Sequence, residues 1–580
     1  MQPTTGLSWL SLKSGSDRAR SLPLFLLLMP PMLARDFQRD TVSADLLVRV
    51  KSLYEEGSWD TIVKLLPASR DYPADMDYYR GMALAGTHRW DEAREAFEAG
   101  QNKNRADKRF PLELAGVAFK QGRLFEARSH LRRALNLDPG DSYANDFLAT
   151  LFLLDQNLEA SLKYWNRIGK PFLETVTTPA LLVRAAILDR AFAFSPASIL
   201  RLDDLLTTRS RLNSMEIFPR YRFELVPRPD NKFDLAFRCV ERNGLGNSWL
   251  EGLLSLFRGI PYQTVHPEFF NLKGSAVNWV SLVRFDAQKR RLYSSLSGPL
   301  GADPKWRYRV YVDGRKENWD VSRTSRSPAL AAGDIALQSV SGGAEIQSTV
   351  NGFWRWKSGL SLTHRKFRRA TAEDEIDGSL FTQGFSLKNH LRVDRQLLLV
   401  PERRLTVNSF ANWELAKILA VPHDAFARVS GGLELQWHPF ARGDDYTLMG
   451  RFGAGKTLGR APFDELFNLG QERDTDLYLR GHRGTRAGKK GNSPLGRDYL
   501  LWNWEFDRVV YAHSRFDLRL GPVIDTGRVY DRFGNFGSDK WLWDAGIQAR
   551  VRIQNRLTLI LTIGKDLRAG REAFHFNAAR

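Results

Sequence analysis

Apolar and polar residues alternate along many segments of the C-terminal part of the chain. The alternation is clearest in residues 306–313, 354–362, 433–437, 502–507, 516–525, 547–553 and 557–563. A period of two residues is typical of a β-strand that presents one apolar and one polar face. We therefore predict that residues 260–580 form an antiparallel β-sheet whose two faces differ in character.

Two architectures would use such strands. In a soluble sandwich the apolar faces of two sheets pack against each other, whereas in a transmembrane barrel they contact lipid and the polar faces line the interior. Tryptophan and tyrosine on the apolar face, and the near absence of helical patterns in this region, favour the barrel. The length fits about 16 strands of about 10 residues each. We predict a closed, 16-stranded transmembrane β-barrel.

Residues 44–170 show helical patterns that recur. Gly122–Ala127 followed by Ala134–Pro139 is similar to the tetratricopeptide repeat (TPR). The small residue that lets two helices approach recurs at spacings of 34 and 33 residues, at Ala93, Ala127 and Ala160. Ile62 fills this place in a degenerate first copy. We predict three to four repeats in a short α-solenoid, which would bind peptides or partner domains. A generic helical bundle is the alternative.

Residues 178–243 combine helical and strand patterns. Apolar residues lie at helical spacing from Ile199 to Leu206, and they alternate in residues 221–225 and 233–237. The segment Pro227–Asn231 supplies a turn between the two alternating stretches. These patterns predict a small α+β domain between the repeats and the barrel, with a generic α+β linker domain as its simplest form.

The N-terminus has the pattern of a secretory signal. The apolar run Leu22–Leu33 follows Arg18 and Arg20 and ends before Ala34. A basic segment, a short apolar segment and a small residue at the cleavage site are the parts of such a signal. We predict a signal peptide over residues 1–34, with a loosely hydrophobic tail as the alternative.

Composition and charge further narrow the classes of protein to which the chain could belong. The mean hydropathy is −0.37, and no run reaches the roughly 18 apolar residues that a spanning helix needs. A net charge of +19 would ordinarily suggest nucleic acid. Here the basic residues alternate with apolar ones along predicted strands, so a solvated lumen and contacts to membrane lipids explain them better. We predict no nucleic-acid partner. Cys239 is the single cysteine, which excludes an intrachain disulfide.

A glycine-rich stretch from Phe467 to Asn492 separates two predicted strands and contains Arg480 directly before Gly481. The polar faces of the strands that follow carry Glu505 and Asp525. If the stretch folds back into a polar interior, the guanidinium would find two carboxylates there, and its fork suits bidentate pairing. We predict that Arg480 anchors an internal loop to Glu505 and Asp525.

The same residues resemble the signature of a known superfamily. The motifs are Phe-Asn-Leu-Gly at 467–470, Leu-Arg-Gly-His at 479–482, Gly-Asn at 491–492, Trp-Asn-Trp-Glu-Phe at 502–506 and Val-Ile-Asp-Thr-Gly at 523–527. They are similar to motifs of the outer-membrane assembly and translocation barrels, the superfamily of the BamA insertase and the two-partner secretion transporters. The chain departs from the pattern at His482, where an aromatic is usual, at Leu479, where valine is common, and at Gln471, where a glycine is expected.

The resemblance implies a bacterial outer-membrane barrel whose N-terminal region lies in the periplasm. It implies that an Arg-Gly loop, here Arg480 and Gly481, enters the barrel and is held by Glu505 and Asp525. It also implies that residues 178–243 form a polypeptide-transport-associated (POTRA) domain that pairs with client strands. The implied function is insertion or translocation of unfolded β-rich polypeptides, with the TPR region recruiting periplasmic proteins or peptides.

Motifs of enzymes are weak in this chain. Gly450–Thr457 matches the P-loop expression, but Gly459 and Pro462 would stop the helix that a P-loop opens. We expect these glycines to make room for the internal loop at the barrel wall. The 10 histidines show no metal-ligand spacing, and no GxSxG elbow occurs. We therefore predict no catalytic residues, no cofactor, no metal site and no enzymatic activity.

Two other functions remain open at this point. The barrel could be a diffusion channel whose lumen charges set ion selectivity, or a membrane anchor for a scaffold in which the solenoid recruits envelope partners. Conductance without any effect on client assembly would indicate the channel. Deletion of residues 44–170 would abolish the function of a scaffold and spare that of a channel.

Overall fold

The computed structural model describes residues 45–323, 330–369, 378–419, 425–440, 445–513, 516–532, 536–538, 540–553 and 557–579. The predicted signal peptide, residues 1–34, lies outside the described residues. The chain divides into two compact units, Met1–Ala144 and Asn145–Arg580, and each is described by itself. Among the described residues, no helix is long and apolar enough to cross a membrane.

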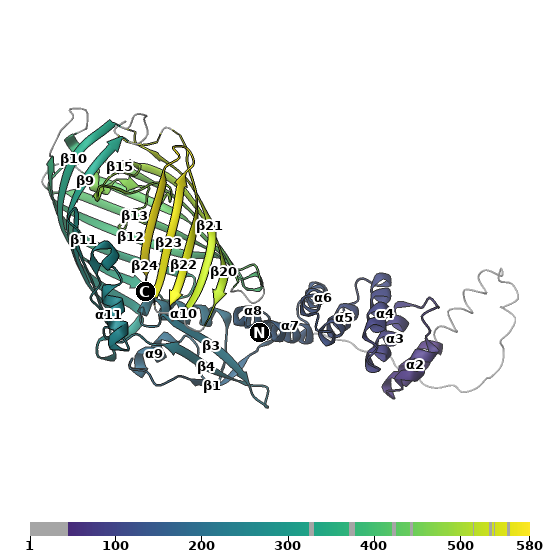
Figure 1. Ribbon diagram of the computed structural model, residues 1–580. Helices are drawn as coiled ribbons and strands as arrows, with labels where there is room; N and C mark the ends of the chain where they lie inside the picture. Colours follow the sequence, from purple (N-terminus) through teal and green to yellow (C-terminus); the bar gives the residue numbers. More distant parts are fainter. Residues whose placement is uncertain are drawn as a thin grey trace, which may run out of the picture. The chain divides into compact units, whose positions relative to one another are not determined.

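The N-terminal region is helical, as the periodic pattern predicted. Helical residues 45–55 are followed by α2 (Trp59–Leu65), α3 (Ala74–Gly86), α4 (Trp90–Lys103), α5 (Arg109–Lys120), α6 (Leu124–Leu137), α7 (Ser142–Leu154) and α8 (Leu158–Trp165). The division between the two units falls near the start of α7. Within the first unit, α3 packs on α4 and α5 packs on α6, so consecutive helices form hairpins (Figure 1).

The small residues chosen from the repeat period lie in the helix contacts. Ala93, Ala127 and Ala160 are all fully buried, each near the start of the second helix of a pair. In the first pair, a Cβ built on Gly81 would lie 2.5 Å from the ring of Phe97, so only glycine lets that ring approach the backbone of α3. Small side chains at this spacing therefore set the distance between paired helices.

A small α+β domain follows. It contains β1 (Phe172–Thr177), α9 (Ala185–Ala191), β2 (Ser198–Ile199), α10 (Leu202–Met215), β3 (Arg220–Pro227) and β4 (Phe233–Val240). The sheet order is β2-β1-β4-β3, with β1 parallel to β4 and β3 antiparallel to it. The predicted hairpin of β3 and β4 is correct. The predicted start at 178 was too late, because β1 is a short strand that alternation alone did not reveal.

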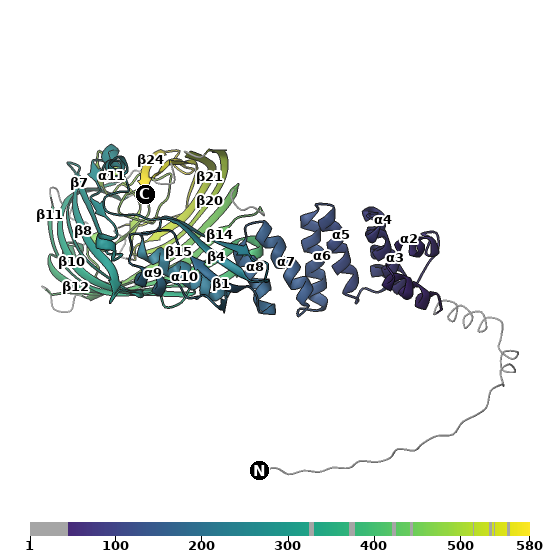
Figure 2. The same cartoon turned by 90° about the horizontal axis from the view of Figure 1, so that it is seen from below.

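The α+β domain is attached to the barrel by a buried arginine. In α10, Arg211 donates from Nη2 to the carbonyl oxygen of Val350 at 2.9 Å and from Nε to that of Thr349 at 3.3 Å. Both carbonyls lie in the turn that follows β10. A further helix, α11 (Trp249–Phe257), connects the domain to the first barrel strands (Figure 2).

The remaining strands form a closed barrel. In the described residues its long strands are β7 (Asn278–Phe285), β8 (Lys289–Leu300), β9 (Asp303–Arg323), β10 (Leu330–Ser348), β11 (Trp354–Arg369), β12 (Gly384–Val400), β13 (Leu405–Ile418), β14 (Ala425–Trp437), β15 (Tyr446–Gly459), β20 (Asp498–Ala512), β21 (Phe516–Tyr530), β22 (Leu542–Ile553), β23 (Leu557–Asp566) and β24 (Glu572–Ala579). Successive long strands pair antiparallel. The order closes through the short strands β5 (Thr264–Val265) and β6 (Glu268–Phe269), which pair with β7.

The strand number differs from the sixteen that the sequence predicted. The described residues form fourteen long strands and one interrupted strand made of β5 and β6. The prediction assumed about 10 residues per strand, whereas β9 has 21 residues and β10 has 19. Longer strands use more of the chain, so fewer of them fit.

The barrel is apolar outside and polar inside. Large apolar side chains that are exposed on its wall include Trp279, Leu292, Leu296, Val310, Val312, Leu360, Leu415, Leu433, Trp502, Phe506, Ile524, Ile547 and Ile563. Charged or polar side chains that are buried in it include Arg284, Asp313, Glu317, Arg365, Asn503, Asp507, Asp525, Asp544 and Gln548. A soluble protein rarely exposes so much continuous apolar surface. The soluble sandwich is therefore excluded, and the predicted parity of the strands is confirmed.

The P-loop match has a structural role. Gly450–Thr457 lie inside β15, so the segment forms a strand and opens no helix. A Cβ built on Gly455 would lie 2.4 Å from the ring of Tyr499 and 2.8 Å from that of Phe467. Because Phe467 belongs to the segment between β15 and β20, the expectation that glycine makes room for the internal loop is confirmed at this position.

Candidate functional site

The segment between β15 and β20 is inserted between two neighbouring strands. β15 and β20 pair directly, from Tyr446 with Arg508 to Lys456 with Asp498. The intervening residues, 460–497, contact β7–β9, β11, β12, β14 and β20–β23 through ion pairs. One segment can reach strands on every side of a barrel only from its interior. We refer to residues 460–497 as the internal loop.

The internal loop is itself folded. Its short strand β16 (Phe467–Asn468) pairs with β19 (Leu495–Gly496), and β17 (Thr485–Arg486) pairs with β18 (Lys489–Lys490). Its apolar residues pack against inward-facing apolar patches of the wall, in two clusters that include Phe463, Leu466, Phe467, Leu469, Leu479 and Leu495. The loop is thus held by apolar packing as well as by charge.

Arg480 is the centre of the first anchor of the loop. Its Nη1 donates to Asp525 Oδ1 at 2.7 Å, its backbone N–H donates to Asp525 Oδ2 at 2.8 Å, and its Nη2 donates to Glu505. Asn503 adds a bridge, because its side-chain amide donates to Asp525 Oδ1 at 2.7 Å and to the carbonyl oxygen of Tyr478 at 2.8 Å. The guanidinium is 5% exposed and the Asp525 carboxylate 1%. The structure therefore places the three predicted residues together as an ion-paired group.

Gly481 lies where the loop touches the wall most closely. A Cβ at this position would lie 2.3 Å from the backbone nitrogen of Asp566 and 2.8 Å from the carboxyl carbon of Asp544. The Gly481 N–H donates to Asp544 Oδ2 at 2.6 Å. On β23, a Cβ on Gly564 would lie 2.2 Å from the carbonyl oxygen of Arg480. Glycines on both sides let the loop backbone rest directly against β22 and β23.

His482 lies between two carboxylates. Its Nδ1 is 3.1 Å from Asp544 Oδ2, and its Nε2 is 3.5 Å from Asp566 Oδ2. One ligand atom from each of the three residues lies within 4.8 Å of the others, a set that could hold a metal ion. Each ring nitrogen faces a different carboxylate, so the imidazole lies between β22 and β23. Spacing in the sequence could not reveal this group, because its members come from the loop, β22 and β23.

Asp474 forms a second anchor on the strands that follow the closure of the barrel. Its carboxylate accepts from Arg284 at 2.9 and 3.2 Å, from Arg291 at 2.7 Å and from Lys490 at 2.8 Å. Lys490 also donates to Glu317 at 2.7 Å. This anchor connects the internal loop to β7, β8 and β9, which are the first long strands of the barrel.

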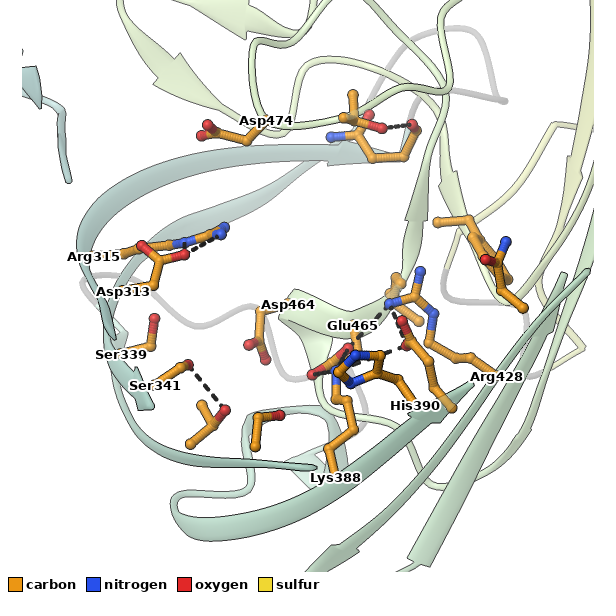
Figure 3. Close-up of a pocket in the computed structure, with 18 of the residues that line it drawn as sticks. Asp313, Arg315, Ser339, Ser341, Lys388, His390, Arg428, Asp464, Glu465 and Asp474 are labelled. Carbon is orange, nitrogen blue, oxygen red and sulfur yellow. Dashed lines mark hydrogen bonds and ion pairs between the residues drawn. The ribbon is translucent and has the colours of Figure 1, made fainter. Parts of the chain in front are cut away.

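Glu465 forms a third anchor. Its carboxylate accepts from Arg365 at 3.0 Å, from Lys388 at 2.7 Å and from Arg428 at 3.1 Å. These cations lie on β11, β12 and β14, and Figure 3 shows Lys388 and Arg428 converging on Glu465. The neighbouring Asp464 accepts from Arg365 at 3.3 Å. The loop is therefore attached on three arcs of the wall.

The pKa values of the adjacent carboxyl groups of Asp464 and Glu465 are shifted in opposite directions. Burial raises the pKa of Asp464, since the nearby cations offset its desolvation only in part and the charge of Glu465 adds to the rise. Burial also acts on Glu465, but Lys388, Arg365 and Arg428 together lower its pKa below the ordinary value. Glu465 is therefore the ionised member that holds the three cations.

A cavity of about 520 Å³ lies beside the third anchor. Its lining includes Asp313, Arg315, Lys388, Arg428 and Asp464, so both signs of charge face the same space (Figure 3). Arg315 and Asp313 pair with each other at 2.6 Å. A lining of mutually paired charges agrees with a water-filled lumen in which the charged residues hold the loop.

Sequence reasoning identified the first anchor and missed the other two. The glycine-rich stretch and strand parity led to Arg480, Glu505 and Asp525. The acidic residues Glu465 and Asp474 gave no comparable signal, since their partners come from strands far away in the sequence. The sequence offers one hint. The loop carries the adjacent acidic residues Asp464 and Glu465, and the polar faces of the predicted strands carry many basic residues.

Fold and site together define a class: a closed β-barrel whose lumen holds an ion-paired loop, preceded by an α+β domain and helical repeats. No family model and no curated relative matches the chain. Among solved structures it is similar to BamA from Haemophilus ducreyi lacking POTRA domains 1–3, at 13% identity and a TM-score of 0.41, over 70% of this chain and 84% of that one.

Two further solved structures are similar to this chain. For CdiB from Escherichia coli the identity is 14% and the TM-score 0.43, over 71% of this chain and 75% of that one. For CdiB from Acinetobacter baumannii the values are 11% and 0.44, over 80% and 86%.

Proposed function

We propose that this protein is a bacterial outer-membrane barrel that inserts or translocates unfolded β-rich polypeptides, with a periplasmic TPR and POTRA region that recruits clients or partners. The observation that carries the proposal is the combination of an internal loop anchored by Arg480, Gly481, Glu505 and Asp525 with a barrel seam built from short strands. The motif resemblance of the sequence points to the same function.

The apolar outer wall supports a location in a membrane. Closure pairs the backbone groups of neighbouring strands, which lipid requires because it offers no hydrogen bonds. Exposed residues such as Trp279, Leu292 and Trp502 would then contact acyl chains. This contact removes their apolar surface from water and so stabilises the barrel in the membrane. Outer-membrane lipids are thus the expected surroundings of the barrel.

The seam supports a role in handling client strands. β24 has 8 residues and β5 and β6 have 2 each, whereas most other wall strands have 12 or more. Few backbone hydrogen bonds can join such short edges, so opening this seam costs less than separating two of the long wall strands. An opened edge offers unpaired N–H and C=O groups to an incoming strand.

The region before the barrel supports recruitment. We assign the α+β domain as POTRA, and its edge strand β3 leaves one row of backbone groups available for an added strand. We assign the helical repeats as TPR, whose stacked hairpins would bind peptides or partner domains. Both modules bind, and neither supplies covalent chemistry.

Depletion of the protein, followed by a quantitative census of outer-membrane and secreted proteins, tests the proposal. We expect a defined subset of β-rich proteins to disappear, and to return with the intact protein but not with an Arg480→Ala variant. An unchanged census, together with ion conductance of the purified barrel in planar bilayers, would instead establish a diffusion channel. A census restored by the repeats alone would establish a scaffold.

A further inference from the structure

The helix α11 has an inverted pattern of burial. Its residues Trp249, Leu250 and Leu254 are 77%, 54% and 52% exposed, and Leu253 and Phe257 are exposed too. Its buried residues are Glu251, Gly252 and Ser255. At 3.6 residues per turn these two sets occupy opposite faces. A helix at the surface of a water-soluble domain would bury the first set and expose the second.

The inward face of α11 is fixed to the protein by polar contacts. The helix begins at an N-cap in which the Ser248 hydroxyl accepts from the N–H of Glu251 at 3.2 Å. Just after it, Arg258 pairs with Glu268 of β6 at 2.5 Å, and both side chains are buried. The N–H of His266 donates to the carbonyl oxygen of Leu256 at 2.9 Å. Arg258 Nη1 also donates to Ser255 Oγ at 3.1 Å, so the buried face of α11 is joined to β6 through Arg258.

α11 lies at the seam of the barrel. Figures 1 and 2 both place it beside β24, the last strand, and its C-terminal end packs on β5 beside β7, the first long strand. The outer wall next to this seam is also apolar, with Trp279 of β7 and Leu292 and Leu296 of β8 exposed. Exposed apolar residues thus lie both on α11 and on the wall strands next to the seam.

We propose that α11 is a lipid-facing helix, whose apolar face contacts phospholipid acyl chains of the periplasm-facing leaflet while its polar face covers the seam. This inference rests on the membrane location in the proposed function. Because α11 follows the α+β domain directly and precedes β5, a displacement of that domain would pull on the helix beside the seam. Contact of α11 with lipid would then oppose opening of the seam until a client polypeptide binds the α+β domain.

The proposal can be tested with single-cysteine variants of the full-length protein. In a Cys239→Ser background, Leu254→Cys carries an environment-sensitive fluorophore, and the protein is reconstituted into phospholipid vesicles with or without lipids that bear a quencher on the acyl chain. Leu292→Cys on the barrel wall is the lipid-exposed control, and Val226→Cys on β3 is the water-exposed control, since both side chains are at least half exposed.

We expect the acyl-chain quencher to reduce the fluorescence at Leu254 as much as at Leu292, and iodide in solution to quench only the label at Val226. Quenching of Leu254 by iodide, or shielding from both quenchers, would overturn the inference, and shielding would assign the face to a protein contact. If the lipid quencher also failed at Leu292, the membrane location itself would be wrong. The same measurement at Leu250→Cys guards against a local effect of one label.

Discussion

Two of the three anchors that hold the internal loop have opposite designs. In the anchor on β20–β23, one cation, Arg480, lies between the carboxylates Glu505 and Asp525 and adds its backbone N–H. In the anchor on β11–β14, one carboxylate, Glu465, lies among the cations Arg365, Lys388 and Arg428. In each case the loop contributes the central charge and the wall contributes the surrounding ones.

The two anchors differ in how much the backbone takes part. At Arg480 the main chain donates to Asp525, and Gly481 rests against the backbone of β23. At Glu465 the contacts with the three wall cations are made by the side chain. A backbone contact fixes the position of the chain, whereas a long side chain can follow small movements of the wall. The first anchor should therefore be the rigid one and the third the adaptable one.

The largest effect is expected from removal of the central cation. Arg480→Ala leaves Glu505 and Asp525 buried near each other with one fewer cation, and breaking a buried pair in this way costs about 3–5 kcal/mol. Urea unfolding of the barrel in detergent, followed by tryptophan fluorescence, measures the loss. We also expect the variant to fail in restoring the proteins that disappear on depletion.

Arg486→Ala is the matched control for this change. Arg486 lies in the same loop and pairs with Asp320 at 2.7 Å, but its side chain is 53% exposed. An exposed pair contributes about 0–1 kcal/mol. If the two variants had equal and small effects on unfolding and on complementation, Arg480 would not be the anchor that we describe.

The rigid character of the first anchor predicts a steric effect at Gly481. Gly481→Ala would push a Cβ into the backbone of β23 and the carboxyl group of Asp544, so we expect a loss of about 3 kcal/mol and a displaced loop. Gly342→Ala on β10 is the control, since its Cβ would meet only a carbonyl oxygen at 3.9 Å. Limited proteolysis of the loop separates displacement from global unfolding. Equal stability of the two variants would show that the loop backbone does not rest on the wall.

Features that depend on near neighbours in the sequence could be predicted, whereas ion pairs between distant parts of the chain could not. Helices from α3 to α8 and the alternation of wall strands depend on near neighbours in the sequence, so period and parity were sufficient for them. Arg480, Glu505 and Asp525 were found because Arg480 lies in the Leu-Arg-Gly-His motif of a glycine-rich stretch, next to two strands of known parity. Glu465 and Asp474 pair with strands up to 190 residues away, and no local pattern carries that information.

Other features escaped prediction for physical reasons of their own. Leu501 and Val529 face the interior although they are apolar, because the internal loop covers them, so strict alternation fails where the lumen is filled. The strand β1 has only 6 residues, too few for a clear period. The outward apolar face of α11 resembles an ordinary core helix in the sequence, and only burial distinguishes the two.

The adaptable anchor predicts a dependence on pH. The pKa of Glu465 is lowered in the folded protein, so its ion pairs contribute stability above its ordinary value of 4.5 and lose it as the pH falls toward the folded pKa. Glu465→Gln should cost about 2 kcal/mol at pH 7 and progressively less below about pH 4.5, measured by urea unfolding across this range.

Asp464→Asn is the control, because its stability should depend on pH in the opposite direction. The pKa of Asp464 is raised in the folded protein, so folding disfavours its ionised form. The protonated carboxyl group therefore contributes stability at low pH, and this contribution is lost as the pH rises through the folded pKa. We expect this variant to be neutral or stabilising at pH 7. A Glu465→Gln penalty that stayed constant with pH, or an equal penalty at Asp464, would contradict the assignment of the charges.

The smallest expected effect is the coupling between the two anchors, and it is the most informative. If the wall and the folded loop are both stiff, releasing one anchor leaves the geometry of the other unchanged. The free-energy losses of Arg480→Ala and Glu465→Gln should then add in the double variant to within about 0.5 kcal/mol. The short pair of β16 and β19 ties the two parts of the loop together, which supports a stiff loop. A double-mutant cycle by urea unfolding measures the difference. A double variant no less stable than Arg480→Ala alone would mean that losing the rigid anchor already frees Glu465, and that the loop is released as a whole.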